Sequence, residues 1–270
     1  MKSKLKFDEP VLRLHGAGVS FSDRIIWDDI NLEIAHGEFV AILGPNGSGK
    51  TTLLKVLLEQ LKLSKGDVEF CTDSPTGRPE IGYIPQQKKF DANLPISGRE
   101  LVTLGVNGKR LGFLNSSAEM KKVDEILKKL NCVDFADRSL SELSGGEQQR
   151  LRAAQSMVNS PDLLLCDEPL LSLDLPSQAN LAMQISNYSQ ETGAAVLFVT
   201  HEINPILPYV SKVLYLANGK WLFDRPEKVF QTKVLTRLYG SPVEVLKVNG
   251  RLIIVGQDES LTDRKSTRLN

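Results

Sequence analysis

One eight-residue segment, GPNGSGKT at 44–51, constrains the fold of this chain more than any other part of its 270 residues. It matches the pattern G-x-x-x-x-G-K-[S/T], in which a glycine-rich backbone cradles phosphate groups. The apolar run at 39–43 predicts a buried strand before it, and the Leu-, Val- and Lys-rich run at 50–63 predicts a helix after it. These flanks are the context that the pattern requires, and they disfavour a glycine-rich turn that precedes a lysine by chance.

The residue types of this loop indicate a nucleoside triphosphate with Mg²⁺ as the ligand. Its three glycines let the backbone turn tightly and approach phosphate oxygens without a clash from Cβ atoms. The loop N–H groups and the helix N-terminus favour an anion. We expect Lys50 to reach the β- and γ-phosphates and the Thr51 hydroxyl to ligate Mg²⁺. The residues predicted to bind nucleotide here are Gly44, Pro45, Asn46, Gly47, Ser48, Gly49, Lys50, Thr51 and Thr52.

The composition of the chain argues against several other classes of protein. Lysine plus arginine and aspartate plus glutamate each total 33, so no net basic field favours nucleic acid as a partner. No apolar run reaches the roughly 18 residues that a membrane helix needs, and the basic N-terminus lacks the apolar segment of a secretion signal. Three scattered cysteines do not indicate a disulfide framework. We therefore expect a soluble protein of the cytoplasm.

Strand and helix patterns alternate along most of the chain. Strands are predicted within 11–40, with turns at 16–18 and 35–38, and at 68–70, 81–84, 163–166 and 194–199; helices are predicted at 116–130, 146–158 and 175–192. This alternation predicts an α/β fold with a largely parallel sheet covered on both faces. The stretch 90–155 has no strand pattern and is predicted to form a mostly helical insertion.

We expect one domain over 1–240, with its helical part at about 90–155, followed by a C-terminal extension at 241–256. Polar and apolar residues of the extension alternate around Asn249 and Gly250, which predicts a β-hairpin. Residues 257–270 are expected to be a disordered or foreign tail, because the polar, basic end of the chain has no periodicity.

Further motifs follow the phosphate loop in order: YIPQ at 83–86, LSGGEQQR at 143–150, LLLCDEP at 163–169, SLD at 172–174 and VTHE at 199–202. Over residues 10–235 the chain resembles ABC-type ATPases, with these motifs as the Q-loop, signature motif, Walker B strand, D-loop and H-loop. Leu173 departs from the family, which usually has alanine there. The resemblance implies an α/β P-loop NTPase core with a mostly parallel sheet, an antiparallel N-terminal β subdomain and a helical signature subdomain.

The resemblance also implies the catalytic groups. Asp167 ends a buried apolar strand, where a lone carboxylate is costly, and is expected to bind Mg²⁺ together with Thr51. Glu168 is expected to be the general base, or polariser, for the attacking water. His201 is expected to contact the γ-phosphate, and Gln86 to reach the Mg²⁺ or the water. The alternative for each residue is an ordinary polar or structural side chain, which the order and spacing of the motifs disfavour.

A second N-terminal anion site is predicted where Ser144, Gly145, Gly146 and Glu147 open a helix. In the family, this motif of one copy covers the ATP held by the phosphate loop of the other. The resemblance therefore implies a head-to-tail dimer with a second ATPase subunit, which we expect to be another copy of this chain. Asp174 is expected to lie at the seam between the two subunits.

An aromatic side chain upstream of the phosphate loop is expected to stack on the adenine base. Phe21 stands at the distance where the family most often has a tyrosine. Trp27 is the competing candidate, although its setting after two isoleucines is typical of a core residue.

Two short segments, KKFDANLPI at 88–96 and LYGSPVEVL at 238–246, resemble the zinc, manganese and iron importer branch of the family. The resemblance implies membrane permease subunits, an indirect extracytoplasmic solute-binding protein, and a location at the cytoplasmic face of the membrane. The three histidines are far apart in the sequence, so metal selection is expected in those partners. The alternatives are an importer ATPase for another solute, an export ATPase and a soluble ATPase without a transport role.

Overall fold

The computed structural model describes residues 9–22, 24–72, 74, 77–86, 95–107 and 116–256. Its central sheet has six strands in the order β5-β6-β7-β3-β8-β9. In that order they span Ile81–Ile84, Leu163–Asp167, Ala195–Val199, Phe39–Leu43, Lys212–Ala217 and Lys220–Asp224. Neighbouring strands are parallel except β8 and β9. Every residue of β3, β6 and β7 is buried, which confirms the predicted parallel sheet with both faces covered.

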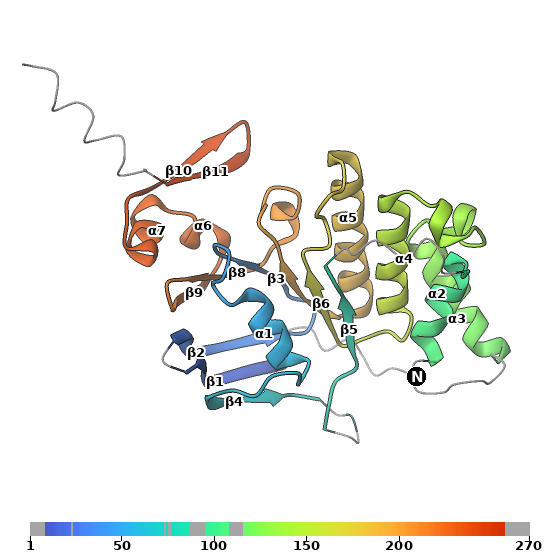
Figure 1. Ribbon diagram of the computed structural model, residues 1–270, viewed down its shortest axis with the longest axis horizontal. Helices are drawn as coiled ribbons and strands as arrows, with labels where there is room; N and C mark the ends of the chain where they lie inside the picture. The colour runs from blue at the N-terminus through green and yellow to red at the C-terminus, as the bar shows by residue number, and fades with distance from the viewer. Residues whose placement is uncertain are drawn as a thin grey trace, which may run out of the picture.

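Two hydrophobic clusters lie on opposite faces of this sheet. Successive side chains of a strand point to opposite faces, so Ala41 of β3 belongs to one cluster and Ile42 to the other. Helix α5 (Leu175–Thr192) contributes to the first cluster, and α1 (Lys50–Leu57) contributes to the second. Figure 1 shows α1 between the central sheet and a smaller antiparallel sheet, with α4 and α5 on the other side.

The smaller sheet has the order β2-β1-β4, formed by Arg24–Ala35, Pro10–Phe21 and Lys65–Phe70. The turn predicted at 16–18 is wrong, because β1 runs through this segment with an irregular register against both neighbours. Gly16 has a φ of 56°, and its N–H donates to Asn31 Oδ1 at 2.8 Å. Gly16, which suggested a turn in the sequence, therefore forms part of a β-bulge.

Helix α1 is also shorter than the 50–63 predicted from composition. It ends at Leu57, and Glu59 has a φ of 57°, which breaks the helical path. The N–H groups of Gln60 and Leu61 both donate to Lys55 O, at 2.8 and 3.2 Å. These two hydrogen bonds to one carbonyl end the helical pattern, and the chain then turns toward β4.

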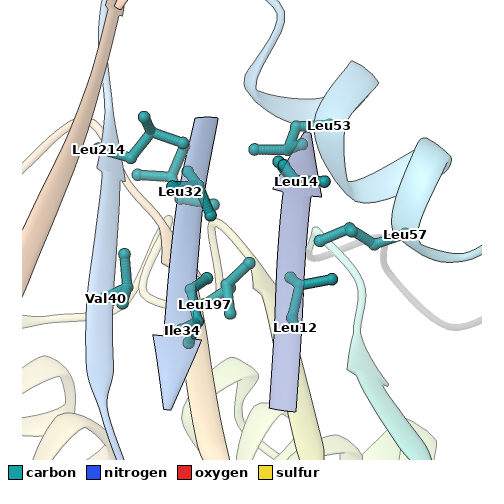
Figure 2. Close-up of a pocket in the computed structure, with 10 residues that line it drawn as sticks. Leu12, Leu14, Leu32, Ile34, Val40, Leu53, Leu57, Leu197 and Leu214 are labelled. Carbon is teal, nitrogen blue, oxygen red and sulfur yellow. The ribbon is translucent and has the colours of Figure 1, made fainter. Parts of the chain in front are cut away.

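A small apolar cavity marks where the antiparallel sheet, α1 and the central sheet meet (Figure 2). Its volume is about 10 Å³. Such a space barely admits one water, and a lining of aliphatic side chains offers that water no hydrogen bond. The lining residues are Leu12, Leu14, Leu32, Ile34, Val40, Ile42, Leu53, Leu57, Leu197 and Leu214. This leucine-rich layer fixes the antiparallel sheet, and with it the end of β1, against the phosphate loop's own strand and helix.

The helical part confirms the helices predicted at 116–130 and 146–158 to within one residue at each end. It contains α2 (Gly98–Asn107), α3 (Ser117–Lys129) and α4 (Gly145–Met157), with short 3-10 turns at Val133–Phe135 and Leu140–Glu142. Helices α3 and α4 both begin with a capping box, from Ser116 and Glu119 and from Ser144 and Glu147. These local signals explain why their start points could be predicted.

The chain continues through α6 (Pro226–Val229), α7 (Thr232–Tyr239) and the antiparallel pair β10 (Val243–Val248) and β11 (Arg251–Gly256). Asn249 and Gly250 have φ values of 49° and 77°, typical of a two-residue hairpin turn. The division of the chain into domains at 240 and 256 stays a prediction. Within the described residues, no helix combines the length and apolar character needed to cross a membrane.

Candidate nucleotide-binding and catalytic site

The phosphate loop runs from the end of β3 to the start of α1, and close backbone approaches require two of its glycines. Gly44 has a φ of 141°, and a Cβ there would lie 2.0 Å from Leu216 O of β8. Gly49 has a φ of 95°, and a Cβ there would lie 2.4 Å from Ile26 Cγ2 and 2.6 Å from the Trp27 ring. Trp27 is fully buried, and its Nε1–H donates to Gly49 O at 3.3 Å. The loop is therefore held tightly from both sides.

This packing predicts that Gly49→Ala is far more damaging than Gly219→Ala. Both glycines have positive φ values, so alanine costs about 1–2 kcal/mol of backbone strain at either position. Only Gly49 has neighbours within 4 Å, and the overpacking there adds about 1–3 kcal/mol. Thermal unfolding and nucleotide titration of the two variants measure the difference. Equal stability of the two variants would contradict this packing.

The Ser48 hydroxyl and the start of α1 lack side-chain partners that would compete with an anion, and Lys50 supplies positive charge beside them. Ser48 Oγ is buried and has no hydrogen-bond partner. The α1 N-terminus has no side-chain cap, whereas α3, α4 and α5 are each capped by a side chain. Lys50 is buried and donates from Nζ to Gly44 O at 2.8 Å and to Pro45 O at 3.0 Å. Burial lowers the pKa of Lys50 against the opposing charges of Glu168 and Asp167. These groups fit a phosphate ligand.

A buried carboxylate lies next to the loop, at the end of β6. Asp167 is only 4% exposed, and burial raises its pKa, with the charge of Glu168 as the second cause. Thr51 Oγ1 donates to Asp167 Oδ1 and Tyr83 OH donates to Oδ2, both at 3.4 Å. These hydrogen bonds and the charge of Lys50 oppose the shift in pKa without cancelling it. The Asp167 carboxylate and the Thr51 hydroxyl offer oxygen ligands, and the neighbouring groups do not fully compensate the negative charge of the carboxylate. This combination fits a Mg²⁺ ion.

The three predicted catalytic side chains converge beyond this carboxylate. Glu168 has a φ of 50°, an uncommon conformation for a residue other than glycine, and its N–H donates to Val199 O at 3.0 Å. Its Oε1 lies 2.5 Å from His201 Nε2, and its Oε2 accepts from Gln86 Nε2 at 3.3 Å. The three side chains follow β6, β7 and β5 respectively, at one edge of the sheet. This edge is where parallel α/β sheets bind ligands.

The signature residues form the start of α4 and are not part of this group. Ser144 Oγ and its N–H donate to Glu147 Oε2 at 2.7 and 2.8 Å. Burial raises the pKa of Glu147, but these hydrogen bonds hold it below its ordinary value. In Figure 1, α4 lies with α2 and α3, well separated from α1. Gly145 and Gly146 begin the same helix, so the four residues belong to α4 and not to the phosphate loop's own helix α1.

Asp174 is the N-cap of α5 and accepts a hydrogen bond from Ser177 N at 2.8 Å. Its hydrogen bonds with Ser177 hold the pKa of Asp174 below its ordinary value. Leu173 stands where the family usually has alanine, and it packs against the core. It also lines a pocket of about 130 Å³, and Gly146 lines the same pocket. The predicted D-loop and signature motif are therefore neighbours, although the two helix starts are 30 positions apart in the sequence.

The two aromatic candidates for adenine binding are in different settings. Trp27 belongs to the core, whereas Phe21 is 50% exposed at the end of β1. Arg24 pairs with Phe21 across the β1–β2 turn, and its Nη2 lies 3.9 Å from where a Cβ of Gly47 would stand. The turn that carries Phe21 therefore reaches the phosphate loop. The sequence did not predict roles for Arg24 and Tyr83, because the approach of Arg24 to Gly47 and the bond from Tyr83 to Asp167 join separate segments.

The fold and this site define a nucleotide-binding α/β protein of the phosphate-loop class. Residues 27–171 match the family described as ABC transporter. The chain is 31% identical over 239 residues, 87% of its length and 95% of the relative's, to the manganese transport system ATP-binding protein MntB of Bacillus subtilis. It is 32% identical over 232 residues, 86% and 82%, to the zinc import ATP-binding protein ZnuC of Histophilus somni.

A chain from an inward-facing ABC transporter structure has the same fold, with a TM-score of 0.79, 24% identity, and coverage of 94% of this chain and 100% of that one. This chain belongs to the ABC transporter family and is one of its ATP-binding subunits. Such subunits are ATPases, so the chain binds and hydrolyses ATP. The antiparallel subdomain and the helical part complete the fold that the sequence motifs predicted.

Proposed function

We propose that this chain powers an ABC importer for a divalent metal ion, with zinc and manganese as the candidate cargoes. The main support is the similarity to manganese and zinc import subunits over more than four-fifths of the chain. The segment 238–246, which resembled this branch, forms the end of α7 and the start of β10. Most of the other segment, 88–96, lies outside the described residues.

The residues at the sheet edge have distinct roles in this proposal. The loop from Gly44 to Thr52 holds the phosphates, and Phe21 packs on the base. Thr51, Asp167 and Gln86 hold Mg²⁺, which when bound supplies positive charge to the phosphate oxygens. These assignments rest on the unpartnered Ser48 hydroxyl, the uncapped α1 and the buried Asp167 carboxylate.

The convergence of Glu168, His201 and Gln86 is the single observation that best supports hydrolysis at this site. The bond between water oxygen and the γ-phosphorus forms while the bond to the ADP oxygen breaks, and Glu168 accepts the proton of the water. His201 Nε2 contacts one carboxylate oxygen of Glu168 and orients it. Gln86 fixes the second carboxylate oxygen in the same way.

A second copy completes the site in this proposal. The signature residues Ser144, Gly145, Gly146 and Glu147 open α4, which Figure 1 shows grouped with α2 and α3 and apart from α1. The positive end of the α4 helix dipole suits the γ-phosphate of ATP bound to another copy. Head-to-tail pairing of two copies brings each α4 onto the other's loop, with Asp174 at the seam.

Ser144→Ala and Ser116→Ala form a matched pair that tests the composite site. Each variant removes one capping box and should cost about 1 kcal/mol of folding stability. Only Ser144→Ala should reduce ATP turnover, by at least about tenfold, because only its helix start faces nucleotide in the dimer. Calorimetry and phosphate release measure the two effects. Equal turnover of the two variants would remove the signature motif from the proposed site.

The proposed partners are membrane permease subunits and, through them, an extracytoplasmic solute-binding protein, which places the chain at the cytoplasmic face of the membrane. The rival is an importer ATPase for a different solute. Cells with and without the chain can be given radiolabelled zinc or manganese, each with the other ion in excess as competitor. Chain-dependent uptake of one ion names the cargo, and uptake of neither ion favours the rival.

A further inference from the structure

The loop that carries His201 is tied to the C-terminal hairpin through one amide side chain. Asn204 Nδ2 donates to Leu252 O at 3.0 Å, and Leu252 N donates to Asn204 Oδ1 at 2.8 Å. The amide thus bonds to both polar groups of one β11 residue, much as a neighbouring strand would. Asn204 Nδ2 also donates to Glu202 Oε1 at 3.1 Å. A residue three positions after His201 is therefore fixed to a segment 48 residues further along the chain.

The hairpin is a firm attachment point because other contacts hold it. Val243 and Leu252 are buried, at 5% and 7% exposure. Val243 N donates to Thr236 Oγ1 at 3.2 Å, and Val245 N donates to Thr232 Oγ1 at 3.0 Å, both on α7. These contacts do not involve the His201 loop. The Asn204 pair therefore transmits the position of an independently anchored hairpin to that loop.

The His201 ring depends on its loop because open space lies beside it. A cavity of about 230 Å³ is lined by Leu43, Gly44, Pro45, His201, Ile203, Tyr215, Tyr239 and Ile254. The His201 side chain is 44% exposed, and its Nε2 contacts Glu168 Oε1. The ring therefore borders the cavity on one side. Its place is set by the loop backbone, between Thr200, which bonds to Glu202, and the Asn204 attachment.

We infer that Asn204 is a positioning residue for catalysis and that the C-terminal hairpin holds the His201 loop in its working place. Ile254 of β11 walls the same cavity as His201, so the hairpin forms one side of the active-site surroundings. Loss of the amide pair frees the loop, and His201 then moves away from Glu168 and from the γ-phosphate. His201 has this role only if the chain hydrolyses ATP as proposed above.

Steady-state ATP hydrolysis by the full chain with Mg²⁺ tests this role. Asn204→Ala should lower kcat about tenfold and leave KM within about twofold of wild type, since positioning and not binding is lost. Asn204→Asp keeps the bond from Leu252 N and loses the other, so an intermediate kcat is expected. Asn159→Ala is the matched control, because Asn159 Nδ2 donates to Gly105 O at 2.8 Å in the helical part. Asn159→Ala should keep the wild-type kcat. Thr236→Val loosens the hairpin on α7 without touching Asn204, so it should lower kcat in the same direction as Asn204→Ala.

A double-mutant cycle separates positioning from general destabilisation. In a His201→Ala background, Asn204→Ala should have no further effect on kcat, because the side chain that it positions is absent. A wild-type kcat for Asn204→Ala, or the same fold-loss in both backgrounds, would overturn the inference. Failure of the proposed function has a different signature: hydrolysis by the wild type would then be absent or independent of Glu168. Circular dichroism and nucleotide affinity confirm that each variant is folded.

Discussion

Glu168→Gln is expected to bind ATP with near wild-type affinity and to hydrolyse it at least about 100-fold more slowly, because glutamine cannot accept a proton from water. The amide can still occupy the space between His201 and Gln86, so the site should keep its shape. With hydrolysis blocked, ATP should hold two copies together. Phosphate release and size-exclusion chromatography with light scattering measure turnover and mass, and a dimer should appear only with ATP and Mg²⁺.

Glu125→Gln is the control for this substitution, because Glu125 is exposed on α3 and far from the sheet edge. It should turn over ATP at the wild-type rate and form no trapped dimer. Rapid hydrolysis by Glu168→Gln would remove Glu168 from the role of general base. A variant that is inactive but remains a monomer with ATP would instead contradict the composite site.

Lys50→Met should reduce ATP affinity by about 100-fold or more, because charge-assisted hydrogen bonds to two phosphates are lost. The apo protein should nevertheless be at least as stable as wild type. Burial lowers the pKa of Lys50, which shows that folding disfavours its charged form, and methionine has no charge to bury. Isothermal titration with ATP and thermal unfolding without ligand give the two quantities separately.

Lys55→Met on the same helix is the matched control, since Lys55 is exposed in the last turn of α1. It should change neither ATP affinity nor stability by a large factor. Unchanged ATP affinity in Lys50→Met would overturn the assignment of the phosphate loop. A large loss of stability would show that the bonds from Lys50 to Gly44 O and Pro45 O hold the apo loop together.

Much of the site could be predicted because its geometry is encoded locally. Gly44 and Gly49 have positive φ values of 141° and 95°, which glycine adopts without strain, and the pattern of glycines reflects that local requirement. Ser144 and Glu147 satisfy each other within one helical turn, so four residues of sequence predict where α4 begins. The order of the motifs then predicted which strand ends carry Asp167, Glu168 and His201.

Other features could not be predicted because they depend on contacts between distant segments. The bulge at 16–18 is visible only when β1 pairs with β2 and β4. The early end of α1 depends on how the chain turns toward β4, and helix propensity alone favoured a longer helix. Tyr83 reaches Asp167 across 84 residues of sequence, and Asn204 reaches Leu252 across 48. No local spacing in the sequence predicts either of these two contacts.

The most direct test of the central claim is the metal content of cells that lack this protein, grown with a metal chelator. Zinc, manganese and iron are measured beside cells complemented with the wild type or with Glu168→Gln. Cellular zinc or manganese is expected to fall, and only the wild type should restore it, because import requires hydrolysis at this site. Unchanged zinc and manganese in all strains, or restoration by Glu168→Gln, would contradict the proposal that this chain powers metal import.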